Sequence, residues 1–401
     1  MLRFLTAGES HGPALVVIID GVPAGLKLTA DDIARDLARR QLGYGRGRRM
    51  AIERDRAEIL SGVRHGATIG SPIALKIDNR DWTNWQHSMA VGKPGDELPG
   101  ARRAPVTRPR PGHADLSGGI KYDRDDLRDV LERASARETA GRVAAGAVAR
   151  KLLEAFGVEI ASHVTGIGGA VVSDPSAVSF ERANAIAWDD DIHCADPKFA
   201  EAMKHAIDAA KEAGDTVGGT FEVIAHGVPA GLGSYTTWDR KLDGRLAQAL
   251  MSIHAIKSVG IGLGHEAGSR PGSQVHDEIV KADKSSVTGT LPSLARPTNH
   301  AGGLEGGVTN GEDVRVTAVM KPISTLMKPL RSVDLATMDE SPAAIERSDV
   351  CAVPAAAVVG EAMVAFVLAE AMLEKFGGDT IDDARAALTH YAARISKRLG
   401  H

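Results

Sequence analysis

The segment AGESHG at residues 7–12 contains two side chains that could do chemistry, Ser10 and His11. The segment fits the pattern G-x-S-x-G, in which a serine nucleophile sits on a sharp turn between a strand and a helix. It also places a histidine among small residues, where the ring could donate a proton. The hydrolase interpretation needs several strands before the turn, whereas one short strand at most can precede residue 8. Proton donation by His11 is therefore favoured.

Arginines are concentrated after this segment. Those between residues 35 and 54, where lysine is absent, are Arg35, Arg39, Arg40, Arg46, Arg48, Arg49 and Arg54. A guanidinium binds phosphate or carboxylate through two parallel hydrogen bonds, so this choice favours planar anions. A solvated residue that complements a helix dipole is the alternative for any single arginine. A nucleic-acid interface is a further alternative, but it would need interleaved aromatics, and the stretch contains only Tyr44.

The segment TRPRPGHADLSGGIKY at residues 107–122 carries the next candidate group. Two prolines stiffen an extended chain that bears Arg108 and Arg110, and a glycine then permits a turn that presents His113 and Asp115. A histidine held rigidly beside arginines suits proton transfer near neutral pH. The alternative is a loop histidine that only bonds to Asp115.

Two further cations fall in a predicted helix over residues 125–157. Arg133 and Arg137 are four residues apart, so they share a face beside a groove of small side chains. This arrangement indicates a bound anion. Helical ion pairs with Glu132 or Glu138 are the alternative.

The last third of the chain offers a glycine-rich turn at residues 301–311, followed by MKPIST at 320–325. Glycines, hydroxyls and one lysine are what a phosphate cradle needs. Neither G-x-x-x-x-G-K-[ST] nor a strand-helix G-x-G-x-x-G is present, so the common nucleotide folds are not indicated. Arg347 and Asp349 precede a helix that begins near Pro354. Asp349 could relay protons, or it could be a capping charge.

Repeated segments indicate how these groups are positioned. The pairs are GVPAGL at 21–26 and 227–232, ARKLLEAFG at 149–157 with AEAMLEKFG at 369–377, and the weaker GATIGSPIALKI at 66–77 with GGVTNGEDVRVTAVM at 306–320. They occur in the same order. We therefore predict one domain over residues 1–401 with two pseudo-repeated halves, about 1–157 and 215–377, and a flexible tail over about 380–401.

The pattern of apolar residues predicts an α+β fold. Strands and long helices come in blocks without strict alternation, which favours antiparallel sheets packed on helices. A helix capped by Thr29 is expected to end near Gln41. The Ala-rich segment from Ala134 to Ala149 is expected to be central and tightly enclosed, because small side chains allow close approach. Segments 91–105 and 267–299 are predicted to be mobile loops.

Composition narrows the class of protein. A chain of 401 residues that is 43% hydrophobic can bury a large core, and its net charge of −4 argues against coating nucleic acid or an anionic membrane. Cys194 and Cys351 lack metal-ligand spacing and favour a reducing compartment. The first residues do not resemble a signal peptide, so we expect a cytoplasmic protein. Glu361 and Glu370 interrupt the longest apolar stretch and favour a buried core helix over a membrane span.

The motifs together resemble the chorismate synthase family from about residue 1 to residue 380. The matching segments are AGESHG, RQLGYGRGRRM, LSGVRHGATIGSPIAL, TRPRPGHADLSGGIKY, ERASARETAGRVAAGAVA, AGGLEGGVTNG, MKPIST and RSDVCAVPA. The resemblance implies conversion of 5-enolpyruvylshikimate 3-phosphate to chorismate and phosphate by anti-1,4-elimination. It also implies a requirement for reduced FMN without net redox change, at the last common step towards the aromatic amino acids.

The resemblance also implies roles for individual residues. His11 would protonate the departing phosphate, His113 would protonate the flavin pyrimidine ring, and Asp349 would act at flavin N5 and help remove the C6 hydrogen. The residues expected around FMN are Arg133, Ala134, Ser135, His254, Ala255, Gly306, Lys321, Pro322, Ile323, Ser324, Thr325 and Arg347. The residues expected to bind substrate anions are Ser10, Arg40, Arg46, Arg49 and Arg137, with Arg40 and Arg46 also suggested as NADP contacts.

Further expectations follow from the family. Its fold is a β-α-β sandwich in which antiparallel sheets enclose helices, and its members are typically homotetramers. The chain ends in polar residues after Gly377, so a separate flavin reductase, with NADPH as the indirect reductant, is expected to supply reduced flavin. Two departures from the family pattern, GIGLGHE at 260–266 and His300, put the local loops in doubt.

Overall fold

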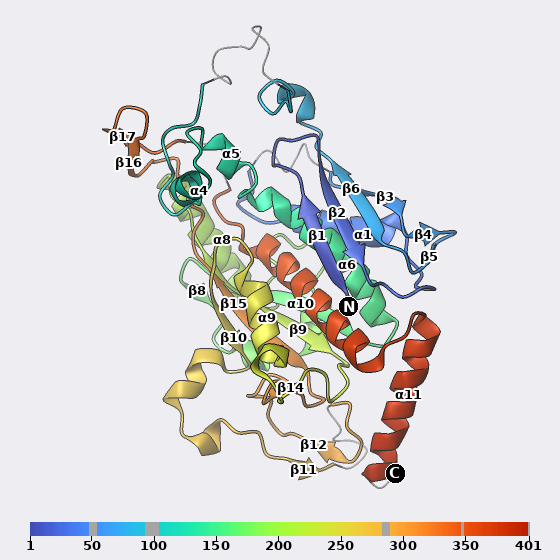
Figure 1. The fold of residues 1–401 in the computed structure, drawn as a ribbon. Coiled ribbons are helices and arrows are strands. Elements are labelled where there is room, and N and C mark those ends of the chain that lie inside the picture. Colours follow the sequence, from blue (N-terminus) through green and yellow to red (C-terminus); the bar gives the residue numbers. More distant parts are fainter. Residues whose placement is uncertain (48–53, 93–103, 283–288, 346–348, 400–401) are drawn as a thin grey trace.

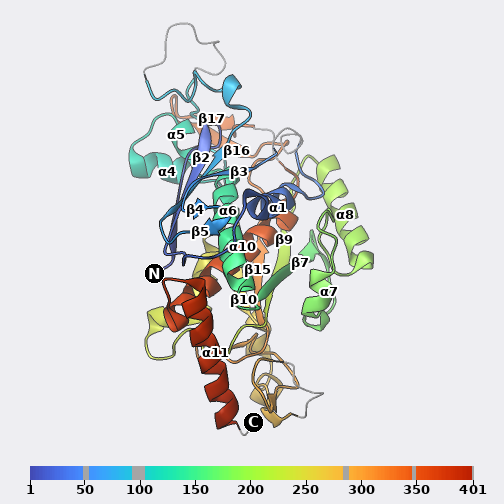
Figure 2. The same ribbon diagram turned by 90° about the vertical axis from the view of Figure 1, so that its right-hand side faces the viewer.

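Two antiparallel sheets lie on either side of two long helices, α6 (Thr139–Glu154) and α10 (Val353–Phe376), as Figures 1 and 2 show. The computed structural model describes residues 1–47, 54–92, 104–282, 289–345 and 349–399. The layers therefore run from sheet to helix, helix and second sheet. This is the mixed arrangement of antiparallel sheets and helices that the sequence predicted.

The first sheet has the strand order β1-β2-β6-β3. Its strands are β1 (Arg3–Ala7), β2 (Ala14–Asp20), β6 (Ile73–Asp78) and β3 (Ala57–Ser61). Along β2, Leu15, Val17 and Ile19 are buried while Val16 and Ile18 are exposed. This period of two gives the sheet one face towards the helices and one face away from them.

The second sheet has the strand order β10-β15-β9-β7-β8. Its strands are β10 (Ile256–Ile261), β15 (Val314–Met320), β9 (Gly219–His226), β7 (Glu159–Ile167) and β8 (Ala170–Val171). Strands β7 and β9 are buried along most of their length, because α10 covers one face and the segment around α7 (Phe180–Asn184) and α8 (Pro197–Glu212) lies on the other (Figure 2).

Small residues let the layers approach closely. A Cβ atom added to Gly146 of α6 would collide with the Cβ of Ala362 on α10. A Cβ added to Gly360 of α10 would lie 2.6 Å from the ring of Phe221 on β9. The expectation that the Ala-rich helix is central and tightly enclosed is therefore confirmed, since nearly every residue of α6 from Thr139 to Leu153 is buried.

Helix α1 (Ala30–Gln41) begins and ends where the sequence predicted. Thr29 caps it, with its hydroxyl accepting from the amide of Asp32 and the Asp32 carboxylate accepting from the amide of Thr29. This capping box satisfies two amides that the first turn leaves without helical partners.

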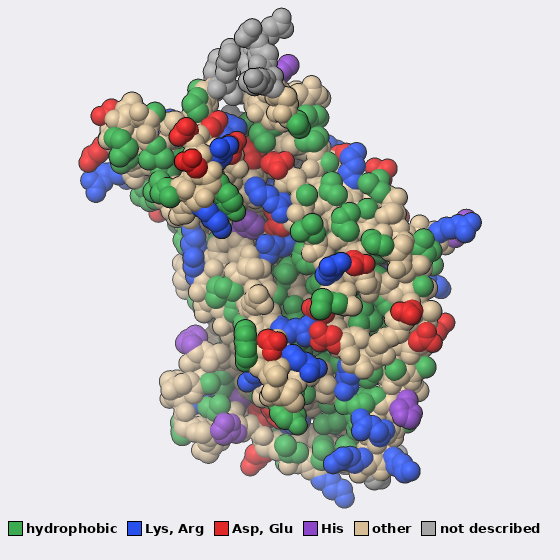
Figure 3. Space-filling view, viewed as in Figure 1, with side chains coloured by type: hydrophobic (Ala, Val, Ile, Leu, Met, Phe, Trp, Pro, Cys, Tyr) green, Lys and Arg blue, Asp and Glu red, His purple; other side chains and the backbone are tan. Residues whose placement is uncertain are grey.

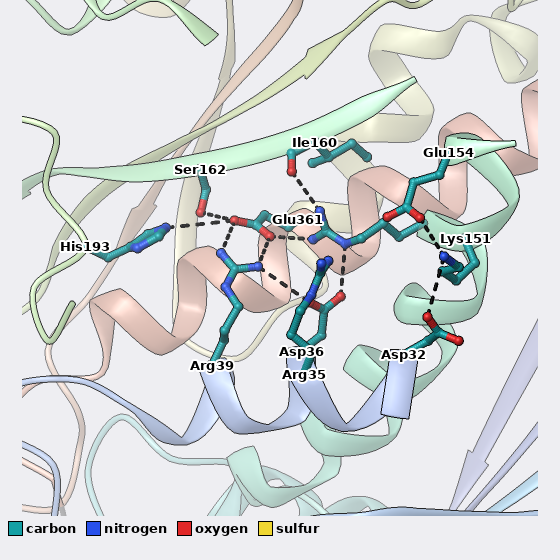
Figure 4. A network of polar contacts seen from close by, with 11 residues as sticks. Asp32, Arg35, Asp36, Arg39, Lys151, Glu154, Ile160, Ser162, His193 and Glu361 are labelled. Carbon is teal, nitrogen blue, oxygen red and sulfur yellow. Dashed lines mark hydrogen bonds and ion pairs between the residues drawn. The ribbon is translucent and has the colours of Figure 1, made fainter. Parts of the chain in front are cut away.

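A buried polar network joins α1, α6, α10 and β7, and Figure 4 shows it from close by. Glu361 of α10 accepts hydrogen bonds from Arg39 (2.6 and 2.8 Å), Arg150 (2.5 Å) and Ser162 (2.6 Å). Arg39 was one of the arginines predicted to bind external anions. Its partner is instead an internal carboxylate, because a buried charge requires a paired neighbour.

Helix α10 is long and apolar enough to cross a membrane by length and composition, yet 89% of its most apolar window is buried within the protein. Its burial between the sheets accounts for its composition. The sequence interpretation of a core helix that accommodates Glu361 is confirmed.

The helix predicted over residues 125–157 is interrupted. It consists of α5 (Arg128–Leu131), the short 3-10 helix η2 (Ala136–Glu138) and α6. Ser135 is extended at φ −67° and ψ 142°, and its hydroxyl accepts from the amide of Arg137. A serine that binds a nearby amide offers the backbone an alternative to the helix, which explains the break. Arg133 and Arg137 therefore do not share one helical face.

The two copies of GVPAGL follow β2 and β9 and make the same hydrogen bonds. In the first copy, the hydroxyl of Thr68 donates to the carbonyl of Pro23 (2.6 Å) and accepts from the amide of Leu26 (2.9 Å). In the second copy, Thr309 makes the equivalent bonds with the proline and leucine of that copy, at 2.7 and 2.8 Å. Thr68 and Thr309 occupy the corresponding place in the weaker repeat pair.

The C-terminal residues differ from the prediction of a flexible tail. Residues Ile381–Arg398 form helix α11, capped by Thr380. Ile381 and Ala384 are buried, and the hydroxyl of Tyr391 donates to the carbonyl of Ala230 at 3.0 Å. Helix α11 forms because a narrow apolar stripe in its otherwise polar sequence packs against the rest of the protein.

The remaining elements are short or lie at the edges. They are β4 (Val63–Arg64), β5 (Ala67–Thr68), η1 (Trp82–Asn84), α4 (Asp115–Tyr122), η3 (Pro175–Ala177), η4 (Trp238–Arg240), α9 (Leu242–Met251), η5 (Gly264–Ser269), η6 (Gly272–Gln274), β11 (Val280–Lys281), β12 (Leu294–Ala295), β13 (Leu304–Glu305), β14 (Val308–Thr309), β16 (Arg331–Asp334) and β17 (Asp339–Pro342). Several fall within 267–299. Residues 93–103 of the other predicted loop, 91–105, lie outside the described part of the chain.

Candidate active site

His11 lies in the turn between β1 and β2. Its Nδ1 is 2.9 and 3.0 Å from the two carboxylate oxygens of Glu132, and its amide donates to Glu132 Oε2 at 2.8 Å. The ring stacks on Trp85 with a centroid distance of 3.9 Å. The amide side chain of Asn79 braces the turn by donating to the carbonyls of Ser10 and Gly12. The imidazole is therefore held on a rigid turn.

The same turn argues against a hydrolytic serine. Ser10 follows one strand and precedes another, β2, so it is not on a turn that leads into a helix. Its hydroxyl accepts a hydrogen bond from the hydroxyl of Ser135 at 3.2 Å. Next to Ser135 and Ala134, Arg133 donates to the carbonyl of Gly8 at 3.0 Å. The predicted flavin segment 133–135 thus lies directly against the turn that carries His11.

Arg40 and Arg137 meet at a shared carboxylate. Arg137 donates to Asp55 at 2.6 and 2.5 Å, and Arg40 Nη1 is 3.5 Å from Asp55 Oδ2. Arg40 also donates to the hydroxyl of Thr139 at 2.9 Å and to the carbonyl of Ala136. Both guanidinium side chains are about 5% exposed. The two predicted anion-binding arginines are therefore brought together from α1 and η2.

His113 lies in the loop before α4. Its Nδ1 is 2.5 Å from Asp115 Oδ1, and Arg110 binds the same carboxylate at 2.8 and 3.1 Å. Burial alone would raise the pKa of Asp115, but the hydrogen bonds and charges of His113 and Arg110 outweigh it and lower that pKa well below its usual range. The bond to Asp115 that the sequence offered as an alternative is present. It orients the ring without excluding a chemical role.

The segment Lys321–Thr325 runs beside this loop. Lys321 Nζ donates to the carbonyl of Gly112 at 2.7 Å, and Arg110 donates to the hydroxyl of Thr325 at 3.3 Å. Gly112 has φ +79°, a left-handed conformation that favours glycine in this turn. Burial lowers the pKa of Lys321.

The other three predicted flavin contacts in this segment, Pro322, Ile323 and Ser324, have neighbours on both sides of the segment. The carbonyl of Ile323 accepts from the hydroxyl of Thr216 at 2.7 Å. A Cβ on Gly218 would lie 2.8 Å from the nitrogen of Pro322. Ser324 is the neighbour of Gly112 on the loop side, at 3.5 Å from its would-be Cβ.

His254 and Ala255 lie between α9 and β10. Burial lowers the pKa of His254 to about 4, against the opposing charge of Glu138, with smaller contributions from Arg142, His113 and Arg40. Its buried Nδ1 has no hydrogen-bond partner among the residues that the structure describes. Ala255 adopts φ +65°, a left-handed conformation that costs a non-glycine residue about 1 kcal/mol or more. The amide of Lys321 holds it through the Ala255 carbonyl.

Asp349 lies just before α10. Its Oδ2 pairs with Arg46 Nη1 at 2.7 Å, and its Oδ1 accepts from the amide of Gly47 at 2.6 Å. The Asp349 side chain is 21% exposed and that of Arg46 is 11% exposed. The first arginine-rich segment is thereby joined to the C-terminal motif, 302 residues further along the chain.

One predicted residue does not join this group, and two others, Arg49 and Arg347, lie outside the described residues. Gly306 lies in the turn between β13 and β14, and its neighbour Gly307 accepts from the amide of Leu242 at the start of α9. His254 follows the other end of that helix. Within one chain, the structure therefore places Gly306 away from the remaining candidates.

Sequence reasoning missed several residues that hold the site. They are Asp55, Asn79, Trp85, Thr139 and Arg142. Arg142 pairs with Glu138 at 2.9 Å and donates to Ser252 near His254. The roles of these side chains depend on contacts with residues that are distant in the sequence. Trp85 gave the one available signal, as a rare aromatic in a polar loop.

The two departures from the family pattern lie together. The amide of Leu263 donates to the carbonyl of His300 at 2.9 Å. Asp277 accepts from the amides of His300 and Ala301 and from the hydroxyl of Thr298. These hydrogen bonds hold the segment around residues 267–299 in place. They lie in the loops, not among the residues around His11 and His113.

Guanidinium, imidazole, ammonium and hydroxyl groups thus form several polar clusters that join segments far apart in the sequence. Figure 3 shows basic side chains interspersed with acidic and apolar ones on the face viewed, not gathered into one field. The α+β fold therefore carries groups of the kind that bind small anions.

The comparisons name the family. The family model described as chorismate synthase matches residues 2–373. Chorismate synthase of Geobacter sulfurreducens is 57% identical over 389 residues, covering 96% of this chain and 97% of that protein. Chorismate synthase of Moorella thermoacetica is 58% identical over 398 residues, covering 98% and 100%. The chain therefore belongs to the chorismate synthase family and is a carbon-oxygen lyase.

The fold agrees with a solved structure. A chain titled "Crystal Structure of Chorismate Synthase" matches with a TM-score of 0.78 and 44% sequence identity, covering 99% of this chain and 98% of that one.

Proposed function

We propose that this enzyme eliminates phosphate from 5-enolpyruvylshikimate 3-phosphate to give chorismate, at the last common step towards the aromatic amino acids. A hydrogen leaves C6 as a proton, the bond between C3 and the phosphate oxygen breaks, and a new double bond forms. The product and phosphate account for all atoms of the substrate. The proposal requires reduced FMN, with no net oxidation or reduction.

The observations that carry this proposal are the hydrogen bonds around the two histidines. His11 binds Glu132, and Ser10 beside it accepts from Ser135. Lys321 donates to the loop that carries His113. A substrate with one phosphate and two carboxylates needs such a convergence of cations and hydroxyls.

The residues fit a flavin. Ala134, Ser135 and Ala255 present small side chains that a flat ring can approach, and the buried Nδ1 of His254 offers a polar atom whose partner is not among the described residues. Lys321 and Arg133 would supply positive charge for the phosphate group of FMN. When bound, reduced FMN would supply electron density transiently and take it back.

His11 and His113 would handle protons at the two ends of the site. His11 protonates the departing phosphate oxygen, because a protonated phosphate is the better leaving group. His113, oriented by Asp115, would help to hold the flavin and would supply a proton to its pyrimidine ring. Asp349 would help to remove the C6 proton.

Arg40, Arg46, Arg49 and Arg137, with Ser10, would bind the substrate anions, and Arg40 and Arg46 would also contact NADP. Asp55 binds Arg40 and Arg137, and Asp349 binds Arg46. These carboxylates hold the three guanidinium groups in position.

The wider context is also a proposal. The enzyme would act in the cytoplasm as a homotetramer, without nucleic acid or membrane as a partner, and a separate flavin reductase would supply reduced FMN from NADPH. Arg347 would complete the flavin site. The matching bonds of Thr68 and Thr309 support an origin of the two halves from one duplicated unit.

An anaerobic assay with reduced FMN and 5-enolpyruvylshikimate 3-phosphate tests the proposal. Chorismate and phosphate should form in equal amounts, and only when the flavin is reduced. Oxidised FMN is the control. Absence of chorismate with reduced flavin, in protein whose fold is intact, would overturn the proposed reaction.

A further inference from the structure

We propose that Glu132 is the positioning residue for His11: it fixes the imidazole with a proton on Nδ1 and favours the protonated ring, so that Nε2 is the atom that delivers a proton. Glu132 acts through His11 and not on the substrate. This inference rests on the proposed function of His11 as an acid.

Glu132 holds His11 from two sides. Its two carboxylate oxygens lie 2.9 and 3.0 Å from Nδ1, and one of them accepts from the His11 amide at 2.8 Å. The Glu132 backbone carbonyl accepts from the amide of Ser10 at 3.0 Å. One residue thus binds both the ring and the backbone of the turn. Rotation of the ring would break two contacts to a buried carboxylate.

The chemistry of Glu132 decides which nitrogen carries the proton. Burial alone would raise the pKa of Glu132, but the hydrogen bonds and charge of His11, assisted by Arg128, outweigh burial and lower it. A carboxylate can only accept hydrogen bonds, so Nδ1 must be the donor. Nε2 lies on the other side of the ring, where it can hold a second proton.

Charged groups of both signs lie around Glu132 and His11. Arg128 of α5 lies 3.6 Å from Glu132 and 5.4 Å from the Trp85 ring on which His11 stacks. The Trp85 indole donates to Asp81 at 2.9 Å, and Glu9 lies in the same turn as His11. Glu132 places a negative charge beside Nδ1 of His11, and Arg128 places a positive charge beside Glu132.

The test is the titration of His11 in the full-length enzyme. NMR with histidine-selective isotope labels, assigned by comparison with His11→Gln, gives the midpoint and the tautomer. Glu132→Gln keeps the shape of the side chain and removes its charge, so the His11 midpoint should fall by about one pH unit or more, a roughly tenfold change in the dissociation constant. In the pH profile of kcat/KM, the part that falls as pH rises should shift to lower pH by the same amount.

Two further variants sharpen the test. Arg128→Met should move the midpoint upwards, opposite to Glu132→Gln. Asp129→Asn removes an exposed charge from the same helix, where Asp129 pairs with Arg124 at 3.6 Å, and should leave both the midpoint and turnover unchanged.

An unchanged midpoint in Glu132→Gln, or an equal loss of kcat at every pH, would overturn the positioning role. If Glu132→Gln does not fold, Arg128→Met decides, and a midpoint that does not rise overturns the role. The NMR result does not depend on turnover. Failure of the unmodified enzyme to form chorismate would count against the proposed function alone.

Discussion

The hydroxyl of Ser135 donates a hydrogen bond of 3.2 Å to the hydroxyl of Ser10. The two residues are 125 positions apart in the sequence. Ser10 precedes His11 in the turn after β1, and Ser135 is the extended residue that breaks the long helix before α6. This bond joins the turn that carries the proposed acid to the segment proposed to contact the flavin.

Loss of either histidine should slow turnover without unfolding the enzyme. We expect His11→Ala and His113→Ala each to lower kcat by roughly 10² to 10⁴-fold, the usual contribution of a positioned acid. Anaerobic steady-state assays measure the effect. His205→Ala, at an exposed position on α8, is the matched control and should keep full activity. Turnover close to that of the control would remove the assigned role from that histidine.

Arg46 should be sensitive to conservative replacement. Lysine keeps the charge but loses the planar fork, so Arg46→Lys should weaken substrate binding by about 1 to 3 kcal/mol. Calorimetric titration with the substrate measures this loss. Arg56→Lys is the control, because Arg56 is exposed and its ion pair is with the exposed Asp31. Equal affinities in both variants would place Arg46 outside the binding site.

Glu361 should stabilise the fold because it compensates two buried cations. Glu361→Gln leaves Arg39 and Arg150 without their carboxylate, and we expect a loss of about 3 to 5 kcal/mol in the free energy of unfolding. Glu370→Gln on the same helix, paired with Arg245 at a more exposed position, should cost less than about 1 kcal/mol. Urea unfolding at pH 7 compares the variants.

The effect of Glu361 should also depend on pH. Burial opposes ionisation, but Arg39 and Arg150 outweigh it and lower the Glu361 pKa far below its ordinary 4.5. The stabilisation by Glu361 is therefore fully present above the pKa that this carboxyl has in the unfolded chain. It is lost as pH falls through the lower pKa that Glu361 has in the folded protein. The difference between the unmodified enzyme and Glu361→Gln should narrow in acid. A constant difference down to the acid limit of folding would contradict this account.

His254 should make the enzyme less stable in mild acid. Burial lowers its pKa from 6.5 to about 4, so the unfolded chain binds a proton in this range while the folded chain does not. Stability should therefore fall as pH drops from about 6.5 to about 4. His254→Asn removes this titration and should lose less stability over the same range, by on the order of 2 kcal/mol. Parallel slopes for both proteins would contradict the prediction.

The sequence by itself determined the local features. The capping box of Thr29 and Asp32, the small residues of α6 and the apolar length of α10 specify their elements through short-range physics and burial. The motifs around His11 and His113 indicated the chemistry, because residue type and spacing fix which groups can exchange protons or bind anions.

Only the tertiary structure decided which groups share a partner. Asp55 between Arg40 and Arg137, Glu132 against His11 and Glu361 beside Arg39 are contacts between distant segments, and no local pattern encodes them. The same holds for the helix break at Ser135, where a side-chain bond competes with the helical ladder, and for α11, which a few apolar contacts attach. Buried charges take whichever opposite charge the fold brings within reach, so their partners are known only once the chain is packed.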